Sequence, residues 1–214
     1  MQVNFCDELG FAFGWIVDEF LQRCSHALVV DGRVWLVDPV DGDGVEERAR
    51  AAGDPAGVIQ LLDRHNRDCS ELATRLGVAH HVVPHASIEQ APFELAVVRD
   101  GRWWKEVALW WPGQRTLILG DALVTVPELR VGDERLALHP LLRLAPPRRA
   151  LGGFDPRHVL CGHGEGVHGD GAAPALREAL ATARRRLPRA WLQGARATVR
   201  TRRAERQGRL RNSP

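Results

Sequence analysis

Short hydrophobic runs alternate with polar segments along this chain, and their spacing predicts strands interspersed with helices. Apolar or alternating residues predict three early strands, over Phe11–Val17, His26–Val30 and Val34–Val37. Asp31-Gly32 separates the last two runs and is a strong hairpin signal. A brief polar helix is expected over Val45–Ala52. This order of segments favours an α/β protein.

The stretch Val58–Gly77 predicts a strand, a polar turn and a helix. Its apolar start has no helical spacing, so we expect a buried strand that ends at about Asp63. Apolar residues then recur at helical spacing from Asp68 until Gly77 ends the helix. Ligands collect at such turns because a helix N-terminus presents free N–H donors. The turn contains Arg64, His65, Asn66, Arg67, Asp68 and Cys69.

The second half of the chain continues as strands and ends in a helix. Turn signals at Asp100-Gly101 and Pro112-Gly113 separate an antiparallel run of strands. The strands are predicted over His80–Val83, Phe93–Arg99, Val107–Trp111, Arg115–Leu119 and Val159–Cys161, and the helix over Pro174–Leu187.

The polar turn resembles the HxHxDH metal-binding motif of the metallo-β-lactamase-fold hydrolases, which also follows a strand and opens a helix. With the aspartate matched to Asp68, the three histidine positions hold Arg64, Asn66 and Cys69. His65 lies one residue out of register, so we do not count it among the ligands. The motif therefore keeps only its aspartate.

Two later segments extend the resemblance over roughly residues 25–185. LILGDAL resembles the strand that ends in the family's metal-bridging aspartate, which would be Asp121. VLCGHG resembles the turn that carries the last histidine ligand, which would be His163. The resemblance implies one metallo-β-lactamase-like domain over residues 1–187, an αββα four-layer sandwich, and hydrolysis of an ester, thioester, amide or phosphoester.

The resemblance also implies a single remaining metal position in a degenerate site. Its ligands would be Asp68, Cys69, Asp121 and His163, a set that suits one zinc ion, or iron or manganese in its place. Asp68 and Asp121 would then be the catalytic carboxylates. Further pocket candidates are Arg64, His65, Asn66 and Arg102, and Arg102 could replace the charge of a missing metal and bind an anion.

Two alternatives without a metal stay open from the residues themselves. Cys69 begins a helix near Arg64 and Arg67, a setting that lowers a thiol pKa and favours a nucleophile. The other alternative is a non-catalytic scaffold that binds an anion or a protein partner. The sequence identifies no particular substrate.

Charge is distributed unevenly along the chain. Residues 184–214 contain eleven arginines and one glutamate, a balance of +10, and since the whole chain carries +2 the remaining part carries −8. We expect residues 188–214 to form a solvated, partly disordered tail, with contact to nucleic acid as the alternative. Four cysteines without CxxC spacing and no apolar run of membrane-spanning length predict a soluble cytoplasmic protein.

Overall fold

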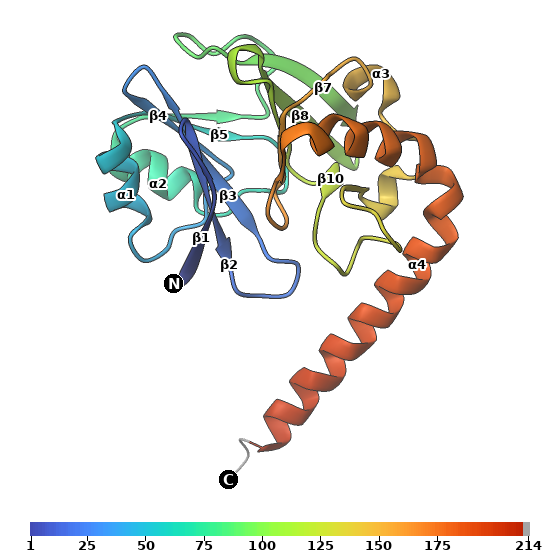
Figure 1. Cartoon of the computed structure of the whole chain (residues 1–214). Coiled ribbons are helices and arrows are strands. Elements are labelled where there is room, and N and C mark those ends of the chain that lie inside the picture. Colours follow the sequence, from blue (N-terminus) through green and yellow to red (C-terminus); the bar gives the residue numbers. More distant parts are fainter. Residues whose placement is uncertain (212–214) are drawn as a thin grey trace.

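The computed structural model describes the backbone of residues 1–211 and the side chains of residues 1–193. Its first sheet has six strands in the order β1-β2-β3-β4-β5-β6 (Figure 1). These are β1 (Val3–Leu9), β2 (Ala12–Val17), β3 (Cys24–Val30), β4 (Arg33–Val37), β5 (Asp54–Gln60) and β6 (Ala79–Val82). The first four pair antiparallel, whereas β4, β5 and β6 run parallel because helices connect them.

The second sheet has five strands in the order β13-β12-β9-β8-β7. They are β7 (Glu94–Gly101), β8 (Trp104–Trp111), β9 (Thr116–Ile118), β12 (His158–Leu160) and β13 (Val167–His168), and β9 pairs parallel with β12. A separate small ribbon joins β10 (Leu123–Val124) to β11 (Ala137–Leu138). Short 3-10 helices occupy Pro112–Gln114, Pro140–Leu142 and Gly169–Gly171.

Three hydrophobic layers hold the elements together. One lies between the first sheet and the helices α1 (Val45–Ala52) and α2 (Cys69–Leu76). A second layer lies between the two sheets. The third lies between the second sheet and the helices α3 (Arg148–Leu151) and α4 (Ala172–Arg211). The order helix, sheet, sheet, helix is the four-layer αββα sandwich that the sequence predicts.

Strand β1 is absent from the sequence prediction. Most of its residues are exposed or half-buried, because it forms the edge of the first sheet. Its sequence, VNFCDEL, consequently lacks the apolar run that marks the inner strands. Asp7 has a left-handed φ of 49°, and the pairing of β1 with β2 shifts register between Cys6 and Leu9.

Helix α4 continues past the end predicted for it at Leu187. Pro188 lies inside the helix, which extends to Arg211 and so crosses the expected boundary between domain and tail. Contacts beyond the proline explain the continuation: Ala190 is buried, and the Gln193 side chain donates to the Pro127 carbonyl at 2.6 Å. The arginine side chains after Gln193, with their expected disorder or nucleic-acid contact, lie outside the described residues.

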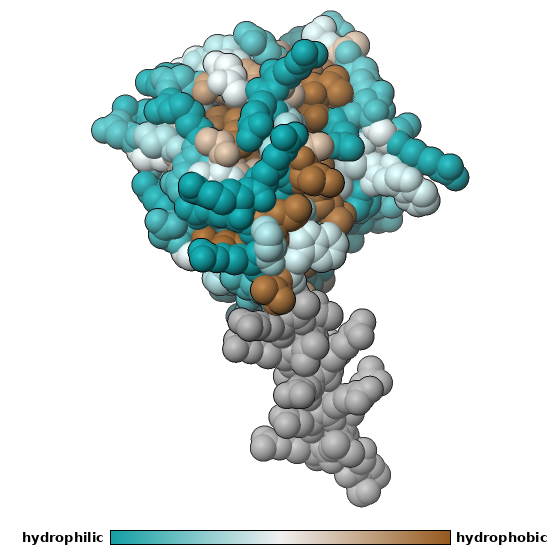
Figure 2. All heavy atoms as spheres, turned by 90° about the vertical axis from the view of Figure 1, so that its right-hand side faces the viewer, coloured by the Kyte–Doolittle hydropathy of each residue, from teal (hydrophilic) through white to brown (hydrophobic). Residues whose placement is uncertain are grey.

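The face formed around α3 and α4 mixes two kinds of surface. Figure 2 shows hydrophilic side chains crossing a band of hydrophobic spheres on this face. Exposed apolar side chains of the described part include Leu141, Leu144 and Leu192. Among the described residues, no helix combines the length and the apolar composition needed to cross a lipid bilayer.

Candidate metal centre

Four titratable side chains meet where parallel strands of both sheets end. Asp38 follows β4 and His65 lies in the turn after β5, at the carboxyl ends of two parallel strands of the first sheet. Asp121 follows β9 and His163 follows β12, the parallel pair of the second sheet. Backbone pairing of Leu62 with Glu106 carries the chain after β5 across to the second sheet. All four side chains thereby face one strand-end site.

These side chains form a continuous hydrogen-bonded line. His65 donates from Nδ1 to Asp38 Oδ2 at 2.8 Å and from Nε2 to Asp121 Oδ1 at 2.8 Å. His163 Nε2 lies 3.1 Å from the same Asp121 oxygen, and its Nδ1 donates to the Leu21 carbonyl at 2.6 Å. Each imidazole is therefore fixed through Nδ1 by an oxygen acceptor and presents Nε2 to Asp121.

Arg67 holds the strand ends of the two sheets in place. It adopts a left-handed φ of 41°, and its guanidinium donates to the carbonyls of Cys24 at 2.6 Å, Asp38 at 2.8 Å and Gly162 at 2.8 Å. Because residue 162 is a glycine, its backbone can approach the ring of His65 closely: a Cβ at this position would lie 2.9 Å from His65 Cε1. In the sequence, Arg67 was recognisable only as a residue of the polar turn and as a positive charge near Cys69. A residue that binds three carbonyls leaves no motif in the sequence.

Burial and charge set the ionisation of the line. Burial and the nearby Arg67 charge oppose protonation of His65, but the carboxylates of Asp38 and Asp121 outweigh them and raise its pKa to about 9. For Asp121, burial raises the pKa, and the hydrogen bonds from His163 and His65 more than reverse this, so it falls well below its usual range. Without an ion, the buried site is an imidazolium between two carboxylates.

A buried carboxyl group lies behind this line. Glu106 on β8 is fully buried and accepts hydrogen bonds from Trp104 Nε1 at 2.7 Å and from the Ala122 N–H at 3.0 Å. Burial and the charge of Asp121 raise its pKa to about 8, although these hydrogen bonds and His65 act in the opposite direction. Glu106 is therefore mostly protonated at neutral pH and adds little negative charge to the site.

Arg64 and His139 lie beside the line. The Arg64 guanidinium is 4.6 Å from the centre of the Trp104 ring, and the His139 ring is 5.0 Å from the same ring. Burial lowers the pKa of His139 to about 4; the Asp121 charge opposes this, while those of His163 and Arg64 reinforce it. His139 is therefore a neutral imidazole near the Asp121–His163 contact.

The structure places two predicted ligands outside the group formed by Asp121 and His163. Asp68 precedes α2, and its Oδ2 accepts from the Asp41 N–H at 2.7 Å. Cys69 is buried in the layer between the first sheet and its helices, and its thiol donates to the His65 carbonyl at 3.4 Å. His65, which the register argument excluded, takes their place. The shifted register places its ring between the two sheets.

Two predicted pocket residues also lie apart from the line. The Asn66 side chain accepts from Gln60 Nε2 at 3.2 Å. Arg102 is exposed at the β7–β8 turn, where its guanidinium lies 5.2 Å from the centre of the Trp103 ring. It therefore does not substitute for a metal charge in the described arrangement.

The donor set fits a metal ion. His65, Asp121 and His163 each offer one ligand atom, and these atoms lie within 4.8 Å of one another. Metal-binding histidines usually donate their other N–H to a carboxylate or a backbone carbonyl, as His65 does to Asp38 and His163 does to Leu21. Two imidazoles and a carboxylate suit zinc, and they also suit iron(II).

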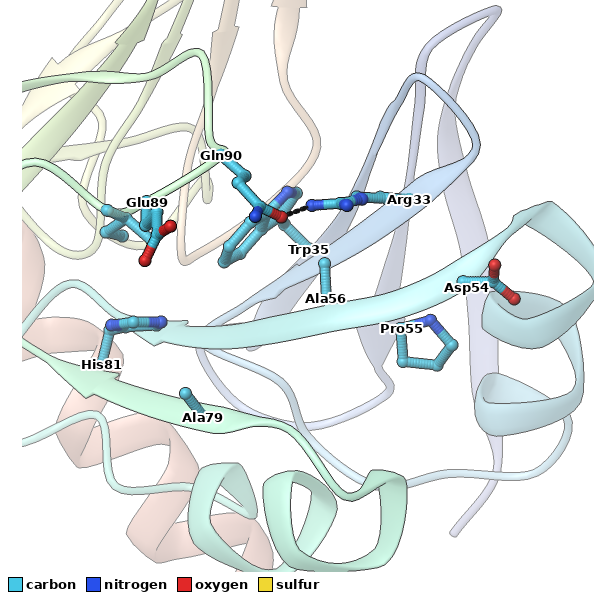
Figure 3. Close-up of a pocket in the computed structure, with 10 residues that line it drawn as sticks. Arg33, Trp35, Asp54, Pro55, Ala56, Ala79, His81, Glu89 and Gln90 are labelled. Atoms are coloured by element: carbon cyan, nitrogen blue, oxygen red, sulfur yellow. Dashed lines mark hydrogen bonds between the residues drawn. The ribbon is translucent and has the colours of Figure 1, made fainter.

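A separate pocket lies elsewhere on the first sheet. It has a volume of about 510 Å³ and is lined by Arg33, Asp54 and Ala79, at the amino ends of β4, β5 and β6. Figure 3 shows Arg33 extending to Gln90, whose side-chain oxygen accepts its hydrogen bond. The candidate centre is at the carboxyl ends of β4 and β5, so this pocket does not belong to it.

Comparison with known proteins gives structural likenesses only. No protein-family model matches the sequence, and no curated protein matches it. The chain is similar to the structure of TMB-1 at 12% identity with a TM-score of 0.60, over 86% of this chain and 99% of that one. A metallo-β-lactamase from Pontibacter korlensis aligns at 11% identity with a TM-score of 0.57, over 84% and 99% of the two chains.

A third likeness agrees with these. DIM-1 metallo-β-lactamase exposed to ceftazidime aligns at 12% identity with a TM-score of 0.51, over 86% of this chain and 98% of its own. The alignments span nearly the whole length of each solved chain and include both sheets of the sandwich described above. Together with the αββα order of layers, they show that this chain has the metallo-β-lactamase fold.

Proposed function

We propose that this protein is a metal-dependent hydrolase with a single ion held by His65, Asp121 and His163. Zinc is the ion we expect, with iron or manganese as alternatives, and the substrate class is an ester, a thioester or a phosphoester. The observation that carries the proposal is the orientation of the two imidazoles. Both have Nδ1 bound to an oxygen acceptor and Nε2 directed at the Asp121 carboxylate.

Three residues of the chain would hold the ion, and others would support them. An ion in such a set supplies Lewis-acid activation of water and of a carbonyl or phosphoryl oxygen. His65 must release its Nε2 proton to become a ligand. Its Nδ1 keeps the proton that it donates to Asp38, and this hydrogen bond holds the ring in its orientation. Arg67 and Gly162 keep the strand ends close enough for the three ligands to meet.

Two residues beside the ligands suit a substrate with a negative group. Arg64 is exposed, and its charge lowers the pKa of His139. The charges of Asp121 and His163 also affect this pKa, so the four side chains lie near one another. The guanidinium donates to the Trp103 carbonyl and lies 3.7 Å from Asp63 Oδ1, so an incoming phosphate or carboxylate would bind its remaining N–H groups. His139 is neutral at pH 7 and its Nδ1 accepts from the Leu141 N–H, so its Nε2–H can donate a hydrogen bond to the substrate.

Metal content of the purified, untagged protein tests the proposal. We expect about one ion per chain bound at the candidate centre, lost in His163→Ala and in Asp121→Asn. Cys69→Ala is the matched control, because Cys69 is a predicted ligand that the structure buries in a hydrophobic layer. This variant should keep the ion. Hydrolysis of chromogenic ester and phosphoester substrates is then compared across the same four proteins.

The outcomes separate the candidate functions. Loss of the ion in Cys69→Ala would favour the sequence-predicted ligand set over His65. An unchanged ion content in His163→Ala and Asp121→Asn would refute the proposed centre. Hydrolysis that is equal in wild type and in both ligand variants would refute the catalytic role and favour a scaffold.

A further inference from the structure

A second group of metal-binding side chains lies between the sheets, on β1 and β3. Cys6, Asp7 and Cys24 each offer a ligand atom, and these atoms lie within 4.8 Å of one another. His26 adds a fourth donor, because its Nε2 is 3.2 Å from Asp7 Oδ2 and 3.5 Å from Cys24 Sγ. Cys24 and His26 are fully or almost fully buried, and Asp7 is 9% exposed.

The strand register explains why these residues share one face. Cys6 pairs with Gly14 and Gly14 pairs with His26, so the three form one row across β1, β2 and β3. Cys24 lies two residues from His26 and therefore faces the same side. Asp7 would normally face the opposite side from Cys6, but its left-handed backbone at the register shift directs it into the same cluster.

Gly14 leaves the centre of this row open. A Cβ at this position would lie 3.0 Å from Cys6 Sγ, 3.1 Å from His26 Cδ2 and 3.2 Å from Asp7 Oδ2. Three of the four candidate ligands therefore surround a place where any other residue would put a side chain. The missing side chain gives the donor atoms room to converge.

We propose that Cys6, Asp7, Cys24 and His26 form a structural zinc site. With tetrahedral geometry, Zn–S bonds of about 2.3 Å and Zn–N and Zn–O bonds of about 2.0–2.1 Å separate S from S by about 3.8 Å, S from N by about 3.5 Å and N from O by about 3.3 Å. The corresponding separations here are 3.9 Å for Cys6–Cys24, 3.5 Å for Cys24–His26 and 3.2 Å for His26–Asp7. These three pairs already have zinc-site spacing.

The remaining oxygen of Asp7 is fixed in the manner of a metal ligand. Its Oδ1 accepts from the Gly166 N–H at 2.8 Å and from His168 Nε2 at 2.8 Å, which leaves Oδ2 for the cluster. His168 belongs to β13 in the second sheet. An ion bound here would therefore tie the edge strand β1 to β3 and, through Asp7, to the second sheet.

A disulfide between the two cysteines is a poor alternative. Strand β2 lies between β1 and β3, so two spacings of about 4.8 Å separate the two backbones. Disulfides join residues whose Cα atoms lie within about 7 Å. Two cysteine sulfur atoms 3.9 Å apart on such distant backbones can be bridged by an ion without backbone movement.

Cobalt substitution tests this site independently of the candidate centre at Asp121. The reduced full-length protein is stripped with a chelator, loaded with Co²⁺ and examined for a sulfur-to-cobalt charge-transfer band in the near ultraviolet. The centre at His65, Asp121 and His163 contains no sulfur, so the band reports the cysteine cluster alone. We expect the band in wild type and in His163→Ala, and its loss in the double variant Cys6→Ser, Cys24→Ser.

Cys69→Ala is the control for loss of a buried thiol and should keep the band. X-ray absorption of the zinc-loaded wild type needs no variant, and it should show sulfur neighbours at about 2.3 Å. Absence of sulfur from the zinc shell would overturn the proposal, as would a cobalt band that survives in the double variant or disappears in Cys69→Ala. A Cys6–Cys24 disulfide found by mass spectrometry of the purified protein, without zinc, would also overturn it.

Discussion

Replacing His65 with glutamine should change how the stability of the metal-free protein depends on pH. His65 is 5% exposed and donates to Asp38 and to Asp121, so its charged form is stabilised by folding. Its pKa rises from 6.5 to about 9 in the folded chain. Glutamine keeps a polar side chain at the site but cannot carry this charge.

The sign and size of the effect follow from proton linkage. A group whose pKa is raised by folding contributes its full stabilisation below its unfolded pKa, and this stabilisation is lost as pH rises through the folded pKa. A shift from 6.5 to about 9 corresponds to about 3 kcal/mol. The free energy of unfolding should therefore fall by about 3 kcal/mol from this source between pH 6.5 and pH 9.

Urea denaturation of chelator-treated protein at pH 6, 7.5 and 9 measures this free energy directly. His65 also influences the pKa of Glu106, so His65 and His65→Gln are compared in a Glu106→Gln background, where the difference between the two curves isolates the imidazole. The curve of the protein that keeps His65 should descend more steeply by about 3 kcal/mol across this range. Parallel curves for the two proteins would refute the imidazolium bridge between Asp38 and Asp121.

Three further perturbations test other parts of the structure. Arg143→Met should lower the free energy of unfolding, measured in a thermal or urea melt, by about 3–5 kcal/mol. The variant leaves the buried Glu134 carboxylate without the two hydrogen bonds of 2.8 Å from Arg143, and adding Glu134→Leu should recover most of the lost stability. Gly162→Ala should lower both stability and metal content, since the new Cβ would lie 2.9 Å from the ring of His65. The pKa of Glu106 rises from 4.5 to about 8, so stability falls as pH rises between these values, and Glu106→Gln should flatten that part of the stability curve.

Local patterns in the sequence were sufficient to predict the elements whose conformation depends mainly on neighbouring residues. Helix α1 has the predicted bounds Val45–Ala52, and Asp31-Gly32 forms the turn between β3 and β4. Asp121 and His163 meet as the motifs imply, because each lies shortly after the end of a strand and β9 pairs parallel with β12. The helix and the turn depend on residues within a few positions of one another, whereas the meeting of Asp121 and His163 was implied by the family resemblance.

Features that depend on distant contacts were not predictable in this way. The position of His65 beside Asp121 depends on the crossing of residues 61–63 to β8, where Leu62 pairs with Glu106. The continuation of α4 past Pro188 depends on contacts such as that between Gln193 and the Pro127 carbonyl. The cysteine cluster depends on a register shift in β1, a strand that the hydrophobic pattern did not reveal. In each case a partner far along the chain determines the local conformation.

The His65 line also explains how the fold can hold an acidic strand-end site without an ion. A buried aspartate needs a compensating positive charge, and in this chain the imidazolium of His65 supplies it to Asp121 and Asp38 together. A metal ion must therefore displace a proton that already neutralises the site. Its affinity should consequently rise with pH and should be weaker than in a site whose carboxylate has no internal partner. Metal binding at this centre would thus compete with an existing ionic network.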